Sequence, residues 1–181
     1  LTWISTPRTL TQVSVYHLFP AKDIKVQQSN AYIASRQGGM NIVSMANEVS
    51  PSFIANYATL GLAMGVKVES NTAYLTTFNT LADGGLERIN IANPAYPTLI
   101  GVPIAVTGNA VSNVDVQGNY AFSAASTEGL QVVLLGNTPS VVASFKLNES
   151  PAPWAYDVKK NGNYAYIAYG QRGLRIVNVP P

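Results

Sequence analysis

The stretch that decides the fold is Gly162-Asn-Tyr-Ala-Tyr-Ile-Ala-Tyr-Gly-Gln-Arg-Gly-Leu-Arg-Ile-Val-Asn-Val-Pro-Pro181, at the end of the printed chain. Two apolar runs of strand length, residues 164–169 and 174–179, flank the short segment Gly170-Gln-Arg-Gly173. Tyr, Ile and Val favour strands, and glycine permits a tight turn. The stretch therefore predicts a β-hairpin.

The same hairpin pattern occurs three more times upstream. Alanines of the first strand recur at spacings of 42, 48 and 44 residues, and glycines before the second strand recur at 46, 44 and 44. These positions are Ala31, Ala73, Ala121 and Ala165, and Gly39, Gly85, Gly129 and Gly173. A period of about 44 residues with four short strands per unit is typical of a β-propeller. We therefore predict an all-β chain of four repeats, each a four-stranded antiparallel blade.

The four repeats fill one predicted domain, residues 1–181, with boundaries near 21–62, 63–107, 108–152 and 153–181. The last repeat lacks a fourth strand, whereas residues 1–20 contain one, with Val13, Val15, His17 and Phe19 in alternation. We expect this N-terminal strand to complete the last blade and remove both sheet edges. Two arrangements remain open: a closed four-blade ring, and part of a larger propeller formed with more blades from this or another chain.

The final repeat also resembles a known family. Ala165-Tyr-Ile-Ala168 followed by Gly173-Leu-Arg-Ile-Val-Asn-Val179 is similar to the LVIVD-repeat propellers of bacteria and archaea. Asn178 stands where that family usually has Asp, and the third repeat ends in Leu134-Leu-Gly136. The resemblance implies a β-propeller that is often extracellular, and it implies no particular activity.

Composition narrows the function. Charged residues make up 11% of the chain, against roughly 25% in an ordinary soluble domain, and the net charge is only +2. No basic cluster is present that would follow a phosphate backbone, so we expect no nucleic-acid partner. No apolar run is long enough for a membrane helix. Few Lys and Glu residues and many Asn, Ser and Thr residues suggest a secreted, cell-surface or periplasmic protein.

Catalytic chemistry has little support in the sequence. With one histidine, His17, and no cysteine, a Ser-His-Asp triad is hard to assemble and a Cys/His metal site is excluded. We expect no cofactor. Asp23, Asp115 and Asp157 are interpreted as sharing one repeat position at the start of the inner strand, where they could ring a channel around a cation such as Ca²⁺. The simpler interpretation is that each caps backbone amides of its own blade.

A binding surface is expected on one rim. If the first strand of each blade is innermost, the loops that lead into it and the turns between the second and third strands lie on the same rim. Pro151-Ala-Pro-Trp154 would present a large aromatic there, and the second repeat is four residues longer between its alanine and glycine. The candidate binding residues are Arg36, Phe78, Asp83, Glu128, Trp154 and Arg172.

These observations favour a non-catalytic binding or scaffolding propeller with a protein or carbohydrate partner at this rim. Two alternatives remain: a structural subunit of an extracellular assembly such as a surface layer or filament, and a carboxylate-based hydrolase or lyase. An enzyme of the last kind would need two carboxylates of different pKa facing one cleft.

Overall fold

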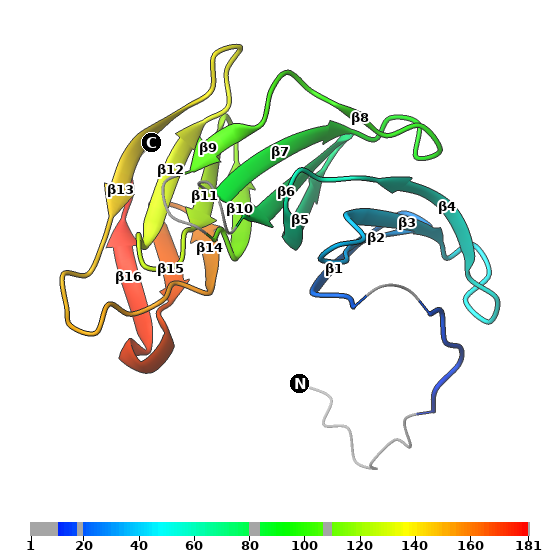
Figure 1. Ribbon diagram of the computed structural model, residues 1–181, viewed down its shortest axis with the longest axis horizontal. Coiled ribbons are helices and arrows are strands. Elements are labelled where there is room, and N and C mark those ends of the chain that lie inside the picture. Colours follow the sequence, from blue (N-terminus) through cyan, green and yellow to red (C-terminus); the bar gives the residue numbers. More distant parts are fainter. Residues whose placement is uncertain (1–10, 18–19, 80–83, 107–109, 181) are drawn as a thin grey trace.

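The structure is a computed structural model that describes residues 11–17, 20–79, 84–106 and 110–180. Figure 1 shows four antiparallel sheets along an arc, with one innermost strand of each sheet toward the concave side. We name the sheets blades one to four in chain order. Apart from one short 3-10 turn, the described elements are strands, and none of the described helical segments is long and apolar enough to cross a membrane. The predicted propeller architecture is confirmed.

The blades have these elements. Blade one holds β1 (Asp23–Gln27), β2 (Asn30–Ala34), β3 (Met40–Ser44) and β4 (Ser52–Tyr57). Blade two holds β5 (Leu62–Glu69), β6 (Thr72–Phe78), β7 (Gly84–Asn90), β8 (Thr98–Leu99) and β9 (Ile104–Val106), and both β8 and β9 pair with β7. Blade three holds β10 (Asn113–Gln117), β11 (Tyr120–Ala124), β12 (Leu130–Leu134) and β13 (Ser140–Phe145). Blade four holds β14 (Asp157–Asn161), β15 (Tyr164–Ala168), the 3-10 turn η1 (Gly170–Arg172) and β16 (Leu174–Asn178).

Tight turns join the first two strands of every blade in the same register. Gln27 pairs with Asn30 in blade one, and Asn161 pairs with Tyr164 in blade four. The first residue of this turn has a positive φ: 53° at Gln28 and 55° at Gly162. Glycine adopts this conformation easily, whereas the glutamine is held in it by the strand pairing around it.

The apolar core lies between blades. At the junction of blades one and two, the sides of β2 and β3 pack on β5, β6 and β7, and the buried side chains include Tyr32, Met40, Ile42, Val66 and Leu75. Similar clusters fill the junctions of blades two and three and of blades three and four. Small alanines such as Ala34 and Ala73 let the sheets approach closely. Each blade is therefore stabilised mainly by its neighbours.

The N-terminal segment does not have the predicted position. Residues 11–17 form no strand, and blade four consists of three strands, β14, β15 and β16. The Ser14 hydroxyl instead donates to the Glu48 carbonyl, at 2.7 Å, in the loop that joins β3 to β4. Among the described residues, the N-terminal segment therefore adds no strand to the last blade, and Phe19 and residues 1–10 lie outside the described residues. Blades one and four lie at opposite ends of an open arc (Figure 1), and β16 is an edge strand that, among the described residues, pairs with β15 alone.

Candidate functional site

Neighbouring blades are bridged at one rim by their backbones. Arg36, in the turn after β2, donates to and accepts from Ala63 at 3.0 Å in each direction. In the same way the amide of Ala155 donates to the Ser126 carbonyl at 2.9 Å, between blades four and three. Each bridge joins the turn between the second and third strands of one blade to the segment at the start of the next. The two sets of loops therefore share a rim, and we call it the bridged rim.

Trp154 and Arg172 come together on the bridged rim of blade four. They line a hollow of about 190 Å³, whose remaining walls are formed by Pro151, Ala152, Pro153, Tyr156, Gly170 and Gln171. The Trp154 side chain is 44% exposed, so it is not buried under its own loop. Its ring lies 6.1 Å from that of Tyr156, centroid to centroid, with the planes tilted by 35°. The two rings therefore form an accessible aromatic surface.

Arg172 is held at this hollow by an ion pair. Its Nε lies 2.5 Å from Oε2 of Glu149, and both side chains are partly exposed. An exposed pair of this kind adds little to stability, with a typical contribution of about 0–1 kcal/mol. Its effect is to place a guanidinium group and a carboxylate beside the aromatic surface, so that both hydrogen-bond donors and acceptors are available there.

The other predicted rim residues do not line this hollow. Arg36 and Phe78 take part in the bridges between blades one and two and between blades two and three. Glu128 forms an ion pair with Lys146 at 2.7 Å in blade three. Asp83, and with it most of the longer loop of the second repeat, lies outside the described residues. The sequence-predicted set is thus spread along the rim, and only Trp154 and Arg172 meet.

The three aspartates do not share one repeat position, and this part of the sequence prediction is wrong. Asp23 pairs with Ala34 and Asp157 pairs with Ala168, but in blade three the residue opposite Ala124 is Asn113. The side chains of Asp23, Asn113 and Asp157 each accept the amide of the next residue, at 2.8 Å. Asp115 is two residues further on, at the position that Lys25, Lys67 and Lys159 occupy in the other blades.

Asp115 instead connects three blades. Its carboxylate accepts from the Lys67 ammonium of blade two at 2.7 Å, from the amide of Val116 at 3.0 Å and from the amide of Lys160 in blade four at 2.9 Å. Burial opposes ionisation of this group, but the hydrogen bonds from Lys67, Lys160 and Val116 outweigh it, so the pKa of Asp115 is lowered. Among the described residues no group of three His, Cys, Asp or Glu side chains is placed to hold a metal ion.

Glu87 is a buried carboxylate that the sequence analysis did not single out. It is 1% exposed in the junction of blades one and two, where it accepts from the Tyr57 hydroxyl at 2.9 Å and from the amide of Leu60 at 3.2 Å. Burial raises its pKa, and the two hydrogen bonds offset part of that shift. Both donors belong to the preceding blade or the loop that follows it. Glu87 therefore joins two blades.

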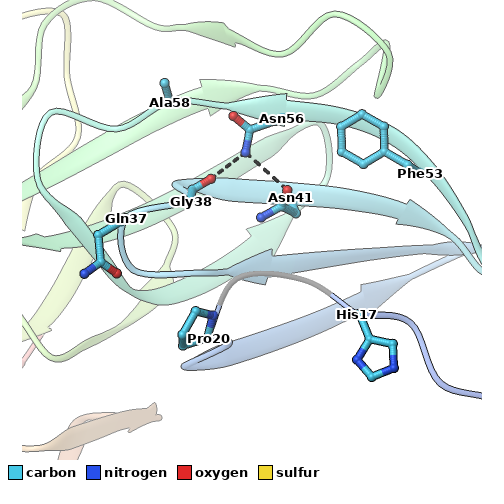
Figure 2. Close-up of a pocket in the computed structure, with 8 residues that line it drawn as sticks. All are labelled: His17, Pro20, Gln37, Gly38, Asn41, Phe53, Asn56 and Ala58. Atoms are coloured by element: carbon cyan, nitrogen blue, oxygen red, sulfur yellow. Dashed lines mark hydrogen bonds between the residues drawn. The ribbon is translucent and has the colours of Figure 1, made fainter.

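A second hollow, of about 720 Å³, lies on the side of blade one that has no neighbouring blade (Figure 2). Phe53, Asn56 and Asn41 line it, together with His17 from the N-terminal segment. The Asn56 amide donates to the Gly38 carbonyl at 2.5 Å and to Oδ1 of Asn41 at 3.3 Å. Nδ2 of Asn41 is buried and has no partner within the described part of the chain. His17 lies at the edge of this hollow.

A third hollow, of about 530 Å³, lies on the rim opposite the bridged one, between blades three and four. The turns at Gly118 and Gly162 form its edge, and Phe122 and Val132 form its apolar floor. The Lys160 ammonium lies over the Phe122 ring, 5.2 Å from its centre. This hollow could not be predicted from the sequence, because its lining residues belong to the regular repeat and carry no insertion.

These features define a β-propeller whose blades are joined by backbone bridges and buried side-chain contacts. The sequence profile of the LVIVD repeat matches residues 20–59, 60–102, 107–144 and 154–179. The chain belongs to the LVIVD repeat family, as the resemblance of its last repeat indicated. No curated protein matches the chain.

Three solved structures share the fold at low sequence identity. The chain overlays on the computationally designed Ika4 protein with a TM-score of 0.67 and 8% identity, covering 94% of this chain and 99% of that one. For the designed Ika8 protein the TM-score is 0.65 at 10% identity, covering 86% of this chain and 45% of the other. For the WD40 β-propeller domain of Doa1 the TM-score is 0.66 at 14% identity, covering 91% and 53%. The chain thus spans about half the length of the last two.

Proposed function

We propose that the protein is a non-catalytic binding or scaffolding propeller whose partner docks on the bridged rim of blade four, over Trp154. The observation that carries this proposal is the exposed pair of rings, Trp154 and Tyr156, beside the Arg172–Glu149 ion pair. Aromatic residues and arginine are enriched among the side chains that dominate binding energy at protein surfaces.

The size of the hollow indicates the kind of partner. Small-molecule pockets usually measure about 300–1,000 Å³, and this hollow has only about 190 Å³. It fits one side chain or one ring of a longer partner, the rest of which would lie along the rim. The guanidinium of Arg172 can donate to a carboxylate or a main-chain carbonyl of such a partner. An extended peptide segment suits this arrangement best, and a carbohydrate chain is the other candidate.

The proposal includes a location outside the cytoplasm, at the cell surface, in the periplasm or in the medium. The support for this location is compositional: the charged fraction is only 11%, and Lys and Glu are few. Detection of the protein in fractionated cells of its source organism would test this part separately.

Binding can be tested with a phage-displayed peptide library and an array of defined oligosaccharides. The probe retained by the unmodified chain is then titrated by calorimetry against the Trp154→Ala variant. Loss of a central aromatic typically costs about 2 kcal/mol or more, so we expect affinity to fall about 30-fold or more. Tyr96→Ala is the matched control, because Tyr96 is an exposed aromatic in a loop of blade two.

Equal affinity of Trp154→Ala and the unmodified chain for the retained probe would refute the site. Retention of oligosaccharides alone would show that the partner is a carbohydrate and not a peptide. Retention of no probe by the unmodified chain would count against a binding function at this rim.

A further inference from the structure

The two ends of the arc expose apolar side chains that inner blades bury. On the open side of blade one, Ile24 is 52% exposed and Val26 63%. On the open side of blade four, Leu174 is 60% exposed and Ile176 58%. Repeat arrays whose units contact only their neighbours need terminal units with a polar outer face to remain soluble. Within the described residues, neither end of the arc has such a face at these positions.

The two exposed faces correspond to the two sides of the junction between blades one and two. One side of that junction is formed by Tyr32, Ala34, Met40 and Ile42, all buried. The strand registers place Tyr166, Ala168, Leu174 and Ile176 at the same positions in blade four. Three of the four positions are therefore identical, and the fourth has Leu174 in place of Met40.

The other side of the same junction has its counterpart in blade one. Val66, Ala73, Leu75 and Ile89 are buried in blade two. The equivalent positions in blade one are Ile24, which is exposed, and Ala31, Ile33 and Val43, which are already buried within one copy. The open face of blade four thus matches the side that blade one contributes to the junction of blades one and two. The open face of blade one matches the side that blade two contributes to it.

The polar groups of that junction are repeated as well. Oδ2 of Asp23 in blade one accepts the amide of Val66 in blade two at 3.0 Å. Asp157 holds the position of Asp23, and Ile24 holds that of Val66. Asp157 is also placed beside Lys159, at 3.9 Å, as Asp23 is beside Lys25, at 3.6 Å. If the open face of another blade one packed against blade four, the Asp157 carboxylate could therefore accept a hydrogen bond from the amide of Ile24.

The two ends of the arc carry the residues that a further backbone bridge of the rim would need. Arg36 and Ser126, which form bridges, have φ values of 45° and 51°. Gly170 is at the equivalent position in blade four and has a φ of 51°. The residue that corresponds to the bridge partners Ala63 and Ala155 is Ala21, which is exposed. Both halves of a fourth bridge are thus present, on opposite ends of one chain.

Asn41 lies on the face of blade one against which, among the described residues, no preceding blade packs. It occupies the position of Glu87, since Asn41 pairs with Ile33 as Glu87 pairs with Leu75. Glu87 receives two hydrogen bonds from the blade that precedes it, whereas Nδ2 of Asn41 is buried and unpartnered among the described residues. An acceptor on a preceding blade would satisfy this amide.

We propose that a second copy of this chain covers both faces, so that two copies join head to tail at two identical junctions into a ring of eight blades. A face that fits a different face of the same molecule closes a ring when its rotation allows, and eight blades lie within the usual range for propellers. This inference does not depend on the rim site.

The test is the mass of the 181-residue chain in solution, measured by sedimentation velocity and by light scattering after gel filtration. We expect twice the chain mass of 19.3 kDa. Two double variants each remove one face: Leu174→Glu with Ile176→Glu on blade four, and Ile24→Glu with Val26→Glu on blade one. Each alone should halve the mass, and both should keep the strand signal in circular dichroism, because the substituted side chains are exposed within one copy.

Mixing separates head-to-tail contact from other contacts. Each double variant keeps the face that the other has lost, so an equimolar mixture should form a 1:1 complex through one junction. Val102→Glu with Leu60→Glu, at exposed apolar positions of blade two and its entering loop, is the matched control and should leave the double mass unchanged. A monomeric unmodified chain, a double variant that still dimerises by itself, or a long polymer in place of a dimer would each overturn the proposal.

Discussion

The Tyr57 hydroxyl donates to the Glu87 carboxylate at 2.9 Å, and this contact joins the last strand of blade one to the third strand of blade two. Because Glu87 is buried, the loss of the donor leaves a charged acceptor with less solvation. Hydrogen bonds that hold a buried charged group are worth about 1.5–3 kcal/mol. The contact is therefore expected to contribute measurably to the cohesion of the array.

Tyr57→Phe should lower the free energy of unfolding by about 1–3 kcal/mol, because the ring stays packed while the hydrogen bond to the buried carboxylate is lost. Urea denaturation followed by circular dichroism measures the change. Tyr96→Phe is the control, since its exposed side chain should give a change within about 0.5 kcal/mol. Equal stability of the two variants would contradict a structural role for the Tyr57–Glu87 contact.

Glu87→Gln should change how stability depends on pH. The pKa of Glu87 is raised in the folded state, so the folded protein binds this proton more readily than the unfolded chain does. The resulting stabilisation is fully present below the unfolded pKa of about 4.3 and is lost as the pH rises through the folded pKa. Relative to Glu87→Gln, the unmodified chain should gain stability from pH 7 to pH 4. Parallel urea curves at both pH values would argue against the shift.

Asp115→Asn should change the pH dependence of stability in the opposite direction. The pKa of Asp115 is lowered in the folded state, so its contribution is present above the unfolded pKa of about 3.9 and is lost as the pH falls through the folded pKa. The unmodified chain should be more stable than Asp115→Asn at pH 7, and the difference should shrink below about pH 4. Lys67→Met, which removes one of the three donors, should reduce the same difference in part.

Gly129→Ala should destabilise the protein more than Gly173→Ala does, although the two glycines share one repeat position. Both have a positive φ, 76° and 68°, so both alanines carry backbone strain of roughly 1–2 kcal/mol. At Gly129 the new Cβ would also collide with the Phe145 carbonyl and the Tyr169 hydroxyl, whereas at Gly173 it would meet nothing within 4 Å. The difference in melting temperature between the two variants is the measurement. Equal losses would mean that a further strand lies beside Gly173 in solution.

Much of the fold could be predicted from the sequence, because each repeat consists of strand-forming residues and of glycines at a nearly constant spacing. The position of Asp115 could not be predicted by matching aspartates. Eight residues before the repeat alanine stand Asp23 and Asp157 in two blades, but Asn113 in the third. Counting from Ala121 would have identified the equivalent residue, since the turn between the first two strands keeps its length.

The candidate site was predictable only in part. Trp154 and its proline-rich loop stand out because they interrupt the repeat, and the structure leaves this ring accessible. Glu87 and Tyr57 could not be paired from the sequence, since the contact joins two different blades and depends on how closely they pack. The same is true of Lys67 and Asp115, which are 48 residues apart.

The three-stranded blade four has a consequence for local opening of the protein. Its edge strand β16 is paired on one side only, and alternate side chains face solvent. Segments with few buried contacts open at a much lower free energy than the molecule as a whole. In hydrogen exchange, the amides of β16 should therefore lose protection before those of β3 and β12, the equivalent strands that are paired on both sides. If a second copy covers blade four, dilution should separate the two copies. The exchange rate of the β16 amides, measured at decreasing protein concentration, would then report the fraction of molecules in which that edge is covered.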